Sequence, residues 1–561
     1  MNRIASLRVA GLFLVATSIT AAGETDRASR IDEIFASFAV PGSPGAAVSV
    51  IQDGKVVFAK GYGLANLELD VPITPQSVFY LGSVSKQFVA ASIALLEQDG
   101  QLSFDDDVRK FIPDLPEYGA PITVRQLIHH TSGLRDYLSL MNLAGLPLGT
   151  FHDNEGVVDL IARQRSLNFD PGEKHLYSNS GYLLLAVIVE KASGKSLREY
   201  AAEKIFEPLG MNNTHFHDDY MHLIPNRASG YFPDPAGGYR NFLSTFDRVG
   251  SGGMFSNLDD LYRWDQNFYS GKVGGKAFIE QLHETGTLND GEGLTYAFGL
   301  TVSEHNGLNV VQHGGALGGY RSTLVRVPEE RFSVIILANV SSAQPGALAL
   351  RVADVFLADR YSEADDTPTI ATNAPESKAA DVSPADLERV TGLYWNADEN
   401  YSRRLYVEDG TLMYWRSFQS QSALAPRGGD RFRMLDVSAR VDVVFDEIVE
   451  GKATRMTVTL DDGDPAISRA YEPVKTTPDY LTAFEGTYHS KELQADYAFF
   501  VRDRALVARL PDGSEIPLKP ALQDLFTVRG LAVHFNRDEE QRVNGFMLDA
   551  GRVQGLQFER D

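Results

Sequence analysis

Near its start the chain switches from a helical to a strand-like spacing of hydrophobic residues. Apolar side chains recur at intervals of three and four over residues 31–38, which predicts an amphipathic helix. They alternate with other residues over 46–50, and an apolar run follows at 56–58, so two strands are expected. Asp53-Gly54 between them is the turn pair that antiparallel strands favour. The pattern therefore predicts a helix followed by a β-hairpin.

Helical patterns dominate the middle of this half of the chain, and strand patterns return at its end. Residues 85–98 and 181–191 are apolar stretches of helical length, and Ser196 with Glu199 is a capping box that begins another helix. Short β-branched strands and a closing helix are expected at residues 308–311, 321–327, 332–337 and 345–359. This order favours an α+β domain over residues 24–360, in which helices cover an antiparallel sheet.

The composition changes beyond this domain. Residues 361–384 are mostly small, polar or acidic, which is typical of a linker. A weak repeat follows, because Gly392-Leu393-Tyr394 recurs as Gly486-Thr487-Tyr488, each before short alternating strands. The repeat predicts two small antiparallel β-barrels, at residues 385–475 and 478–561. A single sandwich of about eight to ten strands is the alternative, because strand patterns are degenerate.

The first 23 residues have the order of a secretory signal peptide. Arg3 and Arg8 precede an apolar run at 9–19, and small residues follow at 20–23. The run is too short to span a bilayer, and no later stretch is apolar for long enough. We expect cleavage near residues 22–23 and export, which in a bacterium means the periplasm or the medium, with no membrane span afterwards. A buried first helix or an uncleaved anchor is the alternative, since short anchors have similar sequences.

Charge and cysteine content exclude several classes of function. The 561 residues include 52 basic and 75 acidic ones, a net charge of -23, and loss of Arg3 and Arg8 with the signal would leave -25. Such a charge repels phosphate backbones, so we expect no nucleic acid partner. The chain has no cysteine. Disulfides, thiolate metal sites, iron–sulfur clusters and cysteine nucleophiles are therefore impossible.

Ser83-Val84-Ser85-Lys86 is the first candidate for chemistry and lies at the start of a predicted helix. Residues three apart share a helix face, so the hydroxyl of Ser83 can meet the amine of Lys86. The structural alternative makes Ser83 a helix cap and Lys86 a solvated residue. A lysine at the positive end of a helix is mildly unfavourable, which favours the functional interpretation.

Tyr177-Ser178-Asn179 is the second candidate, just before the predicted helix at 181–191. Tyrosine accepts a proton only if its pKa falls, which a neighbouring ammonium promotes. Asparagine offers both a donor and an acceptor. Taken alone, this motif is better interpreted as a structural loop.

His313-Gly314-Gly315-Ala316 is the third candidate and follows the predicted strand at 308–311. Glycines beside an edge strand let a substrate backbone come close, and the N–H of Ala316 could point at a developing oxyanion. The alternative is an ordinary Gly-Gly turn.

In their order and spacing, the three motifs resemble those of the penicillin-recognising serine hydrolases. Tyr177-Ser178-Asn179 takes the second place, as in class C β-lactamases and the related peptidases of family S12. Segments that are similar to the same group lie at residues 130–134, 171–172, 252–256, 260–261 and 296–300. Within the family, residues 83–88, 132–137 and 313–317 are most similar to the bacterial D-aminopeptidases, which couple such a domain to two β-barrels.

The resemblance implies a serine hydrolase that forms an acyl-enzyme on Ser83 and uses no cofactor. The backbone N–H groups of Ser83 and Ala316 would hold the oxyanion. Lys86 and Tyr177 would share the role of base. Either burial neutralises Lys86, or a Lys86 cation stabilises a Tyr177 phenolate, and the sequence leaves both open.

Substrate contacts are implied for Asn179, His313, Gly315 and Ala316, and Asn179 would also orient the catalytic lysine. His313 departs from the family pattern, because the usual residue is lysine, a permanent cation for a substrate carboxylate, whereas histidine is mostly neutral at pH 7. We therefore expect a D-aminopeptidase-like enzyme for amide or ester bonds of small or D-amino-acid-containing substrates. The alternatives are a carboxylesterase, a weak β-lactamase or D,D-peptidase, and a non-catalytic penicillin-binding-like sensor.

One cluster outside these motifs has metal-ligating residue types, namely His215, His217, Asp218, Asp219 and His222. Their irregular spacing favours a solvated loop, since zinc needs three or four converging ligands, so no metal is expected. The expected partner is a small-molecule or peptide substrate. The sequence leaves open whether the chain forms a homodimer.

Overall fold

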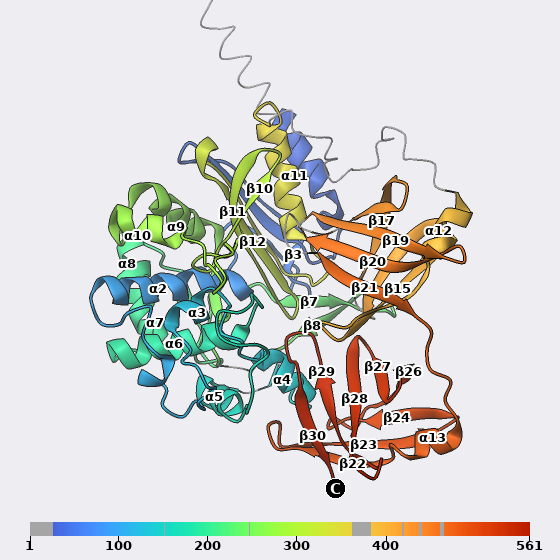
Figure 1. Ribbon diagram of the computed structural model, residues 1–561. Coiled ribbons are helices and arrows are strands. Elements are labelled where there is room, and N and C mark those ends of the chain that lie inside the picture. Colours follow the sequence, from blue (N-terminus) through green and yellow to red (C-terminus); the bar gives the residue numbers. More distant parts are fainter. Residues whose placement is uncertain are drawn as a thin grey trace, which may run out of the picture.

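The computed structural model describes residues 26–361 and 383–561, apart from residues 148, 151, 246, 418–419, 436, 438–439 and 461–464. The predicted signal segment, 1–23, lies outside the described residues, and so does nearly all of the predicted linker, 361–384. The described part comprises a mixed helix-and-sheet domain and two barrel-like β-domains (Figure 1).

A six-stranded antiparallel sheet is the centre of the first domain. Its strand order is β10-β11-β12-β13-β1-β2, so the N-terminal hairpin pairs with the last strand of the domain. The strands are β1 (Ala46–Gln52), β2 (Lys55–Tyr62), β10 (Thr301–His305), β11 (Leu308–Leu317), β12 (Tyr320–Val327) and β13 (Phe332–Ala338). The expected hairpin, the late strands and the antiparallel sheet are confirmed.

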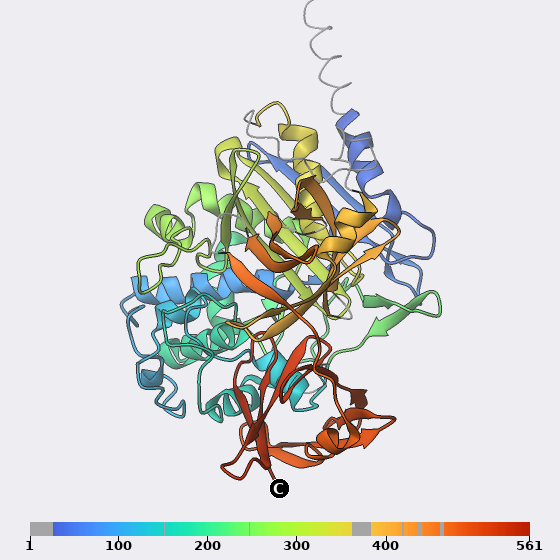
Figure 2. The ribbon, with the colours of Figure 1, turned by 45° about the vertical axis from the view of Figure 1, so that its right-hand side comes forward.

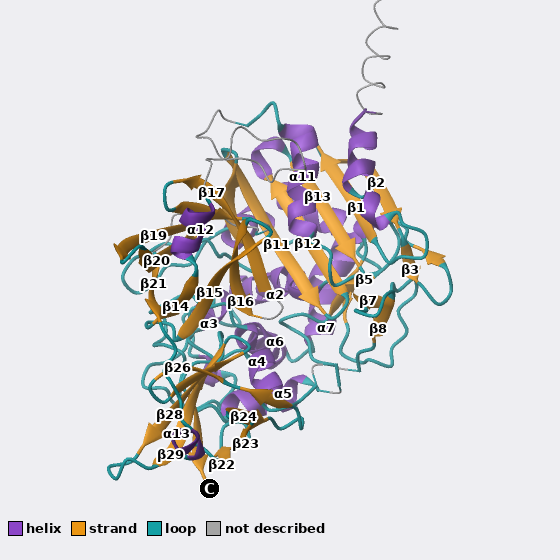
Figure 3. Cartoon of the chain, turned by 90° about the vertical axis from the view of Figure 1, so that its right-hand side faces the viewer, coloured by secondary structure: helices purple, strands orange, loops and turns teal. Residues whose placement is uncertain are grey.

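Helices cover both faces of this sheet (Figure 3). The helix at residues 26–34 and α11 (Pro345–Leu357) lie on one face, where Val48 and Val50 of β1 pack. Ala47 and Ile51 of the same strand belong to the other core, beneath α2 (Lys86–Gln98). Both sets of alternating positions are therefore buried, which explains why β13 is apolar at every position except Ser333, whose hydroxyl donates to the carboxylate of Asp265.

The connection between β2 and β10 forms the helical layer next to the sheet. Its helices include α3 (Val124–Ile128), α4 (Tyr137–Leu143), α5 (Asn154–Ala162), α6 (Asn179–Ser193), α7 (Leu197–Ala201), α9 (Leu258–Ser270) and α10 (Gly275–Leu282). The predicted capping box is present, since the side chain of Ser196 accepts from the backbone of Glu199 and the reverse contact is also made. A small sheet of β5 (Phe79–Tyr80), β9 (Met254–Ser256) and β6 (His215–Phe216) joins this layer to the nucleophile motif described below.

The C-terminal half forms two separate antiparallel sheets, so the single-sandwich alternative is wrong. The first closes into an eight-stranded barrel, β14 (Gly392–Asn396) to β21 (Ala466–Tyr471), behind the short helix α12 (Pro384–Val390). The second has nine strands, from β22 (Gly486–Ser490) to β30 (Leu556–Arg560), behind α13 (Pro478–Thr482). It curls around an aromatic core that includes Phe499, Phe535 and Phe546.

The sequence repeat corresponds to the same structural device in both barrels. The hydroxyl of Tyr394 donates to the carbonyl of Val390 at 3.0 Å, and that of Tyr488 donates to the carbonyl of Phe484 at 2.9 Å. The glycine two residues before each tyrosine has a positive φ, 146° and 147°, which favours glycine. Each tyrosine therefore ties the first strand of its barrel to the segment that precedes the strand.

The second barrel packs against the helical layer beside α4 (Figures 1 and 2). Arg135 is fully buried at this contact and forms an ion pair of 3.0 Å with Glu492. Its guanidinium also donates to the carbonyls of Gln554 and Gly555, which precede β30. The hydroxyl of Tyr497 donates to the carbonyl of Leu143, the last residue of α4, at 2.8 Å. These contacts hold the loop that includes residues 552–555 next to the first domain.

Candidate active site

Ser83 lies in a tight turn between the small sheet and the long helix α2. The turn is the 3-10 helix η2 (Gly82–Ser85), and Gly82 begins it with a φ of +55°, a conformation that favours glycine. Ser83 is partly exposed, whereas Ser85 is fully buried and donates to the carbonyl of Gly82 at 2.7 Å. Of the two serines in the motif, Ser83 is therefore the one that a substrate can reach.

Lys86 is completely buried beneath Ser83. Its Nζ lies 3.1 Å from Oγ of Ser83, 2.9 Å from Oδ1 of Asn179 and 2.6 Å from the carbonyl oxygen of Ser251. Burial holds the pKa of Lys86 well below its ordinary value of 10.5, although the carboxylate of Asp136 opposes this effect. A neutral amine has two hydrogens and one lone pair. With two carbonyl-type acceptors occupying the hydrogens, the lone pair is left for the hydroxyl of Ser83.

Asn179 is held in one orientation by Asp136, a residue to which the sequence assigned no role. The carboxylate of Asp136 accepts from both the backbone N–H and Nδ2 of Asn179, each at 2.7 Å. With Nδ2 bound there, Oδ1 is directed to Lys86. Asp136 also caps α4, where it accepts from the N–H of Ser139. It was detectable only as part of the similar segment at 132–137, because no local pattern links it to Asn179.

Tyr177 lies beside both members of the Ser83–Lys86 pair. The centroid of its ring is 4.8 Å from Nζ of Lys86 and 4.2 Å from the centroid of the His130 ring. Burial raises the pKa of Tyr177 above its ordinary value, opposed by a hydrogen bond with Ser83 and by the guanidinium of Arg552. Of the two alternatives that the sequence left open, these shifts favour a neutral Lys86 over a Tyr177 phenolate.

The third motif lies inside β11, so the strand predicted at 308–311 continues through residues 313–316 and the alternative of a Gly-Gly turn is wrong. A Cβ on Gly315 would lie 1.9 Å from the carbonyl oxygen of Leu81, and one on Gly82 would lie 2.6 Å from the amide nitrogen of Ala316. Only glycine lets the strand and the nucleophile turn approach so closely. The backbone N–H of Ala316 thus lies next to the turn that carries Ser83.

His313 does not line the cavity described below. Its Nε2 is 3.0 Å from the hydroxyl of Tyr296, and its Nδ1 is 2.6 Å from the carbonyl of Gly314. Burial lowers the pKa of His313 to about 4, and the nearby amine of Lys86 adds to this effect. A neutral His313 at pH 7 agrees with the sequence analysis, and the site keeps the imidazole neutral to a lower pH than that of an ordinary histidine.

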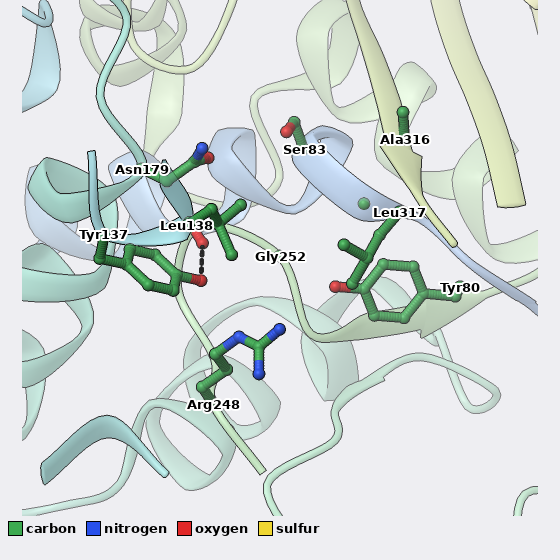
Figure 4. A pocket seen from close by; sticks show the side chains of 11 residues that line it. Tyr80, Ser83, Tyr137, Leu138, Asn179, Arg248, Gly252, Ala316 and Leu317 are labelled. Atoms are coloured by element: carbon green, nitrogen blue, oxygen red, sulfur yellow. Dashed lines mark hydrogen bonds between the residues drawn. The ribbon is translucent and has the colours of Figure 1, made fainter. Parts of the chain in front are cut away.

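A cavity of about 320 Å³ opens beside Ser83. The described residues that line it are Tyr80, Gly82, Ser83, Tyr137, Leu138, Asn179, Arg248, Ser251, Gly252, Ala316 and Leu317. Figure 4 shows the guanidinium of Arg248 pointing into the space between Tyr137 and Tyr80. No sequence pattern pointed to Arg248, which lies outside every motif.

The second barrel also contributes a charge near the site. The guanidinium carbon of Arg552 is 4.7 Å from the centroid of the Tyr177 ring. The backbone carbonyl of Arg552 accepts from the N–H of Asp136 at 3.1 Å, so the two domains meet at the residue that orients Asn179. No sequence pattern linked residue 552 to residues 136 and 177, because their proximity depends on how the domains pack.

The histidine cluster lies apart from these residues. Nε2 of His215 is 3.2 Å from Nδ1 of His217, and burial lowers the pKa of both to about 4. Within the described ranges, no group of three or more His, Asp or Glu side chains has the geometry to hold a metal ion. The helices of those ranges include none that is long and apolar enough to cross a membrane.

Comparison with known families gives one match that covers more than half of the chain. Residues 31–357 match the family model described as Beta-lactamase. Among curated proteins, "Penicillin-binding protein 4*" of Bacillus subtilis is 30% identical over 438 residues, which are 74% of this chain and 92% of that protein. A D-aminopeptidase of Gluconobacter oxydans is 32% identical over 315 residues, which are 55% of this chain and 59% of that enzyme. The chain thus spans a little over half the length of the D-aminopeptidases that it matches.

Solved structures give the same fold. An octameric penicillin-binding protein homologue from Pyrococcus abyssi matches with a TM-score of 0.55 and 25% identity, over 79% of this chain and 99% of that one. The D-amino acid amidase of Ochrobactrum anthropi matches with a TM-score of 0.52 and 23% identity, over 60% of this chain and 99% of that one. The expected fold class and family resemblance are confirmed.

Proposed function

Since the chain belongs to the beta-lactamase family of serine hydrolases, we propose that it hydrolyses amide or ester bonds of small D-amino-acid derivatives through an acyl-enzyme on Ser83. The observation that carries this proposal is the contact of 3.1 Å between Oγ of Ser83 and the buried amine of Lys86. A serine next to an amine whose pKa is lowered by burial is an activated nucleophile.

In the proposed reaction, Lys86 takes the proton of Ser83 as Oγ attacks the substrate carbonyl. The backbone N–H groups of Ser83 and Ala316 stabilise the resulting oxyanion. Tyr177 gives its hydroxyl proton to the leaving nitrogen or oxygen, and Lys86 returns the proton to Tyr177, so the base is neutral again. Water then attacks the acyl-enzyme, Lys86 takes a proton from this water and passes it to Oγ of Ser83, and the acid is released. Asn179 holds the substrate amide.

The choice of substrate class rests on the relatives. The matched D-aminopeptidases and the D-amino acid amidase are named for D-amino acid substrates. The amidase is also similar to this chain in fold. The neutral His313 supports substrates that lack the carboxylate of penicillin beside that residue. The match to the Gluconobacter oxydans aminopeptidase covers 55% of this chain, so the activity of the whole chain is inferred from its own site.

The test is turnover by the purified chain on D-aminoacyl p-nitroanilides, short p-nitrophenyl esters and a chromogenic cephalosporin. The proposal expects hydrolysis of the D-aminoacyl anilides, faster than of the L-isomers, and its loss in Ser83→Ala. Ester hydrolysis alone would make the chain a carboxylesterase, and cephalosporin hydrolysis alone a weak β-lactamase. Binding of the cephalosporin without any turnover would make it a sensor of the penicillin-binding type.

We also propose export to the periplasm or the medium, supported by the charge and hydropathy order of the first 23 residues. Expression of the full chain in a bacterium, followed by fractionation and N-terminal sequencing, tests this. A new N-terminus near residues 22–23 in the exported fraction is expected, and an uncut chain in the cytoplasm would contradict it.

For assembly we propose a monomer or homodimer, which light scattering tests. The Pyrococcus abyssi homologue is an octamer.

A further inference from the structure

Arg248 is a buried cation in the wall of the cavity beside Ser83. The residue is only 3% exposed, yet its guanidinium points into the cavity (Figure 4). The hydroxyl of Tyr137 is a hydrogen-bonding partner of this guanidinium, which keeps its charge at any physiological pH. Among the described residues that line this cavity, no other side chain carries a formal charge.

The backbone on both sides of Arg248 is held in place. The N–H of Asp247 donates to the carbonyl of His152 at 3.2 Å, and the N–H of Val249 donates to Oδ1 of Asn154 at 2.9 Å. The carboxylate of Asp247 accepts from the N–H of Tyr220 at 2.6 Å. These contacts position the arginine before a substrate arrives, which lowers the entropic cost of binding.

A neighbouring cavity is also lined by a positively charged side chain. It shares Tyr80 with the first cavity, and its other described lining residues are His217, Tyr220, Arg227, Ser244, Gly253 and Phe255. Burial keeps His217 neutral near pH 7 by lowering its pKa to about 4. The charge on its walls is therefore that of Arg227, and no acidic side chain is among its described lining residues. The formally charged side chains among the described lining residues of the two cavities are thus Arg248 and Arg227, although the chain as a whole is strongly acidic.

The cavity suits the acyl part of the substrate better than the leaving group. In the proposed mechanism Tyr177 gives its proton to the leaving group, and Tyr177 is absent from the described lining, as is His313. Ser83 and Asn179, which contact the acyl carbonyl and its amide, are both part of the lining. A group that reaches Arg248 is thus carried by the portion that stays bonded to Ser83.

We propose that Arg248 binds an anionic group on the acyl part of the substrate, so that the preferred substrates are D-acyl derivatives with a side-chain carboxylate. Guanidinium and carboxylate match in geometry and form charge-assisted hydrogen bonds. This inference rests on the proposed function, because the assignment of the acyl side depends on Ser83 and Tyr177 acting as described.

The experiment compares D-glutamyl p-nitroanilide with D-glutaminyl p-nitroanilide, which differ in the charge of the side chain and scarcely in size. In the wild type, kcat/KM should favour the glutamyl substrate by about tenfold to hundredfold, the range for a hydrogen bond to a charged group. Arg248→Gln should bring the ratio close to one, and Arg248→Lys should keep part of the preference. Arg240→Gln removes the same charge from a side chain that is 73% exposed and should leave the ratio unchanged.

A second readout does not depend on turnover. Calorimetry on Ser83→Ala should show tighter binding of D-glutamate than of D-glutamine, and a further Arg248→Gln change should abolish the difference. Hydrolysis with a wild-type ratio near one would overturn the role of Arg248 and leave the proposed function standing. Absence of hydrolysis for both anilides would overturn the proposed function, and the calorimetric comparison would then decide the role of Arg248 alone.

Discussion

The amine nitrogen of Lys86 lies 3.1 Å from the hydroxyl oxygen of Ser83, at the end of a chain of contacts that runs back to Asp136. Asp136 fixes the amide of Asn179, and Asn179 occupies one hydrogen of the lysine amine. The lone pair of a neutral Lys86 is thereby directed at Ser83. We expect measurable effects on the pH dependence of kcat/KM, on the close approach of β11 to the nucleophile turn, and on the contact between the first domain and the second barrel.

Lys86→Met should lower kcat/KM by about 10²- to 10⁴-fold, the usual contribution of a general base. In the wild type, kcat/KM should fall as the pH drops through the pKa of Lys86, because protonation removes the lone pair. Burial lowers that pKa, so this decline should lie well below pH 10.5. Tyr177→Phe is the control: it should be slower than the wild type but keep the acid-side decline. Loss of the decline in Tyr177→Phe would make tyrosine the base.

Asp136→Asn should slow the enzyme by up to about hundredfold, because one carboxylate oxygen accepts from Asn179 and the other from the N–H of Ser139, and the NH2 group of an amide cannot accept at either place. Asp136 raises the pKa of Lys86. Its neutralisation should therefore move the acid-side decline of kcat/KM to lower pH, a shift that a purely structural role would not produce. Asp107→Asn neutralises another helix-capping carboxylate and should leave the pH profile in place.

Gly315→Ala should reduce kcat/KM strongly, because its Cβ would lie 1.9 Å from the carbonyl oxygen of Leu81 and push β11 away from the nucleophile turn. Gly314→Ala is a matched control one residue away, where the nearest atom to a new Cβ is 3.7 Å distant. Steady-state kinetics on both variants, with thermal unfolding curves, makes the comparison. Equal activity in the two variants would contradict the close-approach argument.

Glu492→Gln should destabilise the contact between the first domain and the second barrel by about 3 to 5 kcal/mol, because it leaves the buried guanidinium of Arg135 without its counterion. Denaturant unfolding measures this change. Glu559→Gln breaks the exposed pair with Lys491 and should cost no more than about 1 kcal/mol. Similar losses in the two variants would show that the barrel is held mainly by its apolar contacts.

His313→Lys should improve kcat/KM for a cephalosporin by about tenfold to hundredfold, since it places a permanent cation beside Gly314. The wild-type preference between cephalosporin and D-aminoacyl anilide should stay constant down to about pH 5, because burial lowers the pKa of His313 to about 4 and its charge does not change in that range. Rates for both substrates across this range provide the check. A wild-type shift centred near pH 6.5 would mean that His313 is solvated.

Local patterns predicted the elements of this fold well. The hairpin, the late strands and the pairing of Ser83 with Lys86 depend on residues close in sequence, so spacing alone was informative. The turn that two adjacent glycines could also form at residues 314–315 is excluded only by the structure, in which they let a strand interior approach the backbone of Leu81.

Contacts between distant segments account for the parts of the site that the sequence did not reveal. Asp136, Arg248 and Arg552 have no local signature, and each reaches the site through the packing of separate elements. The choice between Lys86 and Tyr177 as base was equally hidden, because it depends on the burial of each group and on the charges around it.

Covalent labelling of the nucleophile tests the central claim most directly. The purified chain is incubated with a fluorophosphonate, and the modified residue is identified by peptide mass spectrometry. The account predicts a single adduct on Ser83, none in Ser83→Ala, and much slower labelling in Lys86→Met, in which the serine is no longer activated. An adduct on Ser85, or labelling of Ser83→Ala at the wild-type rate, would contradict it.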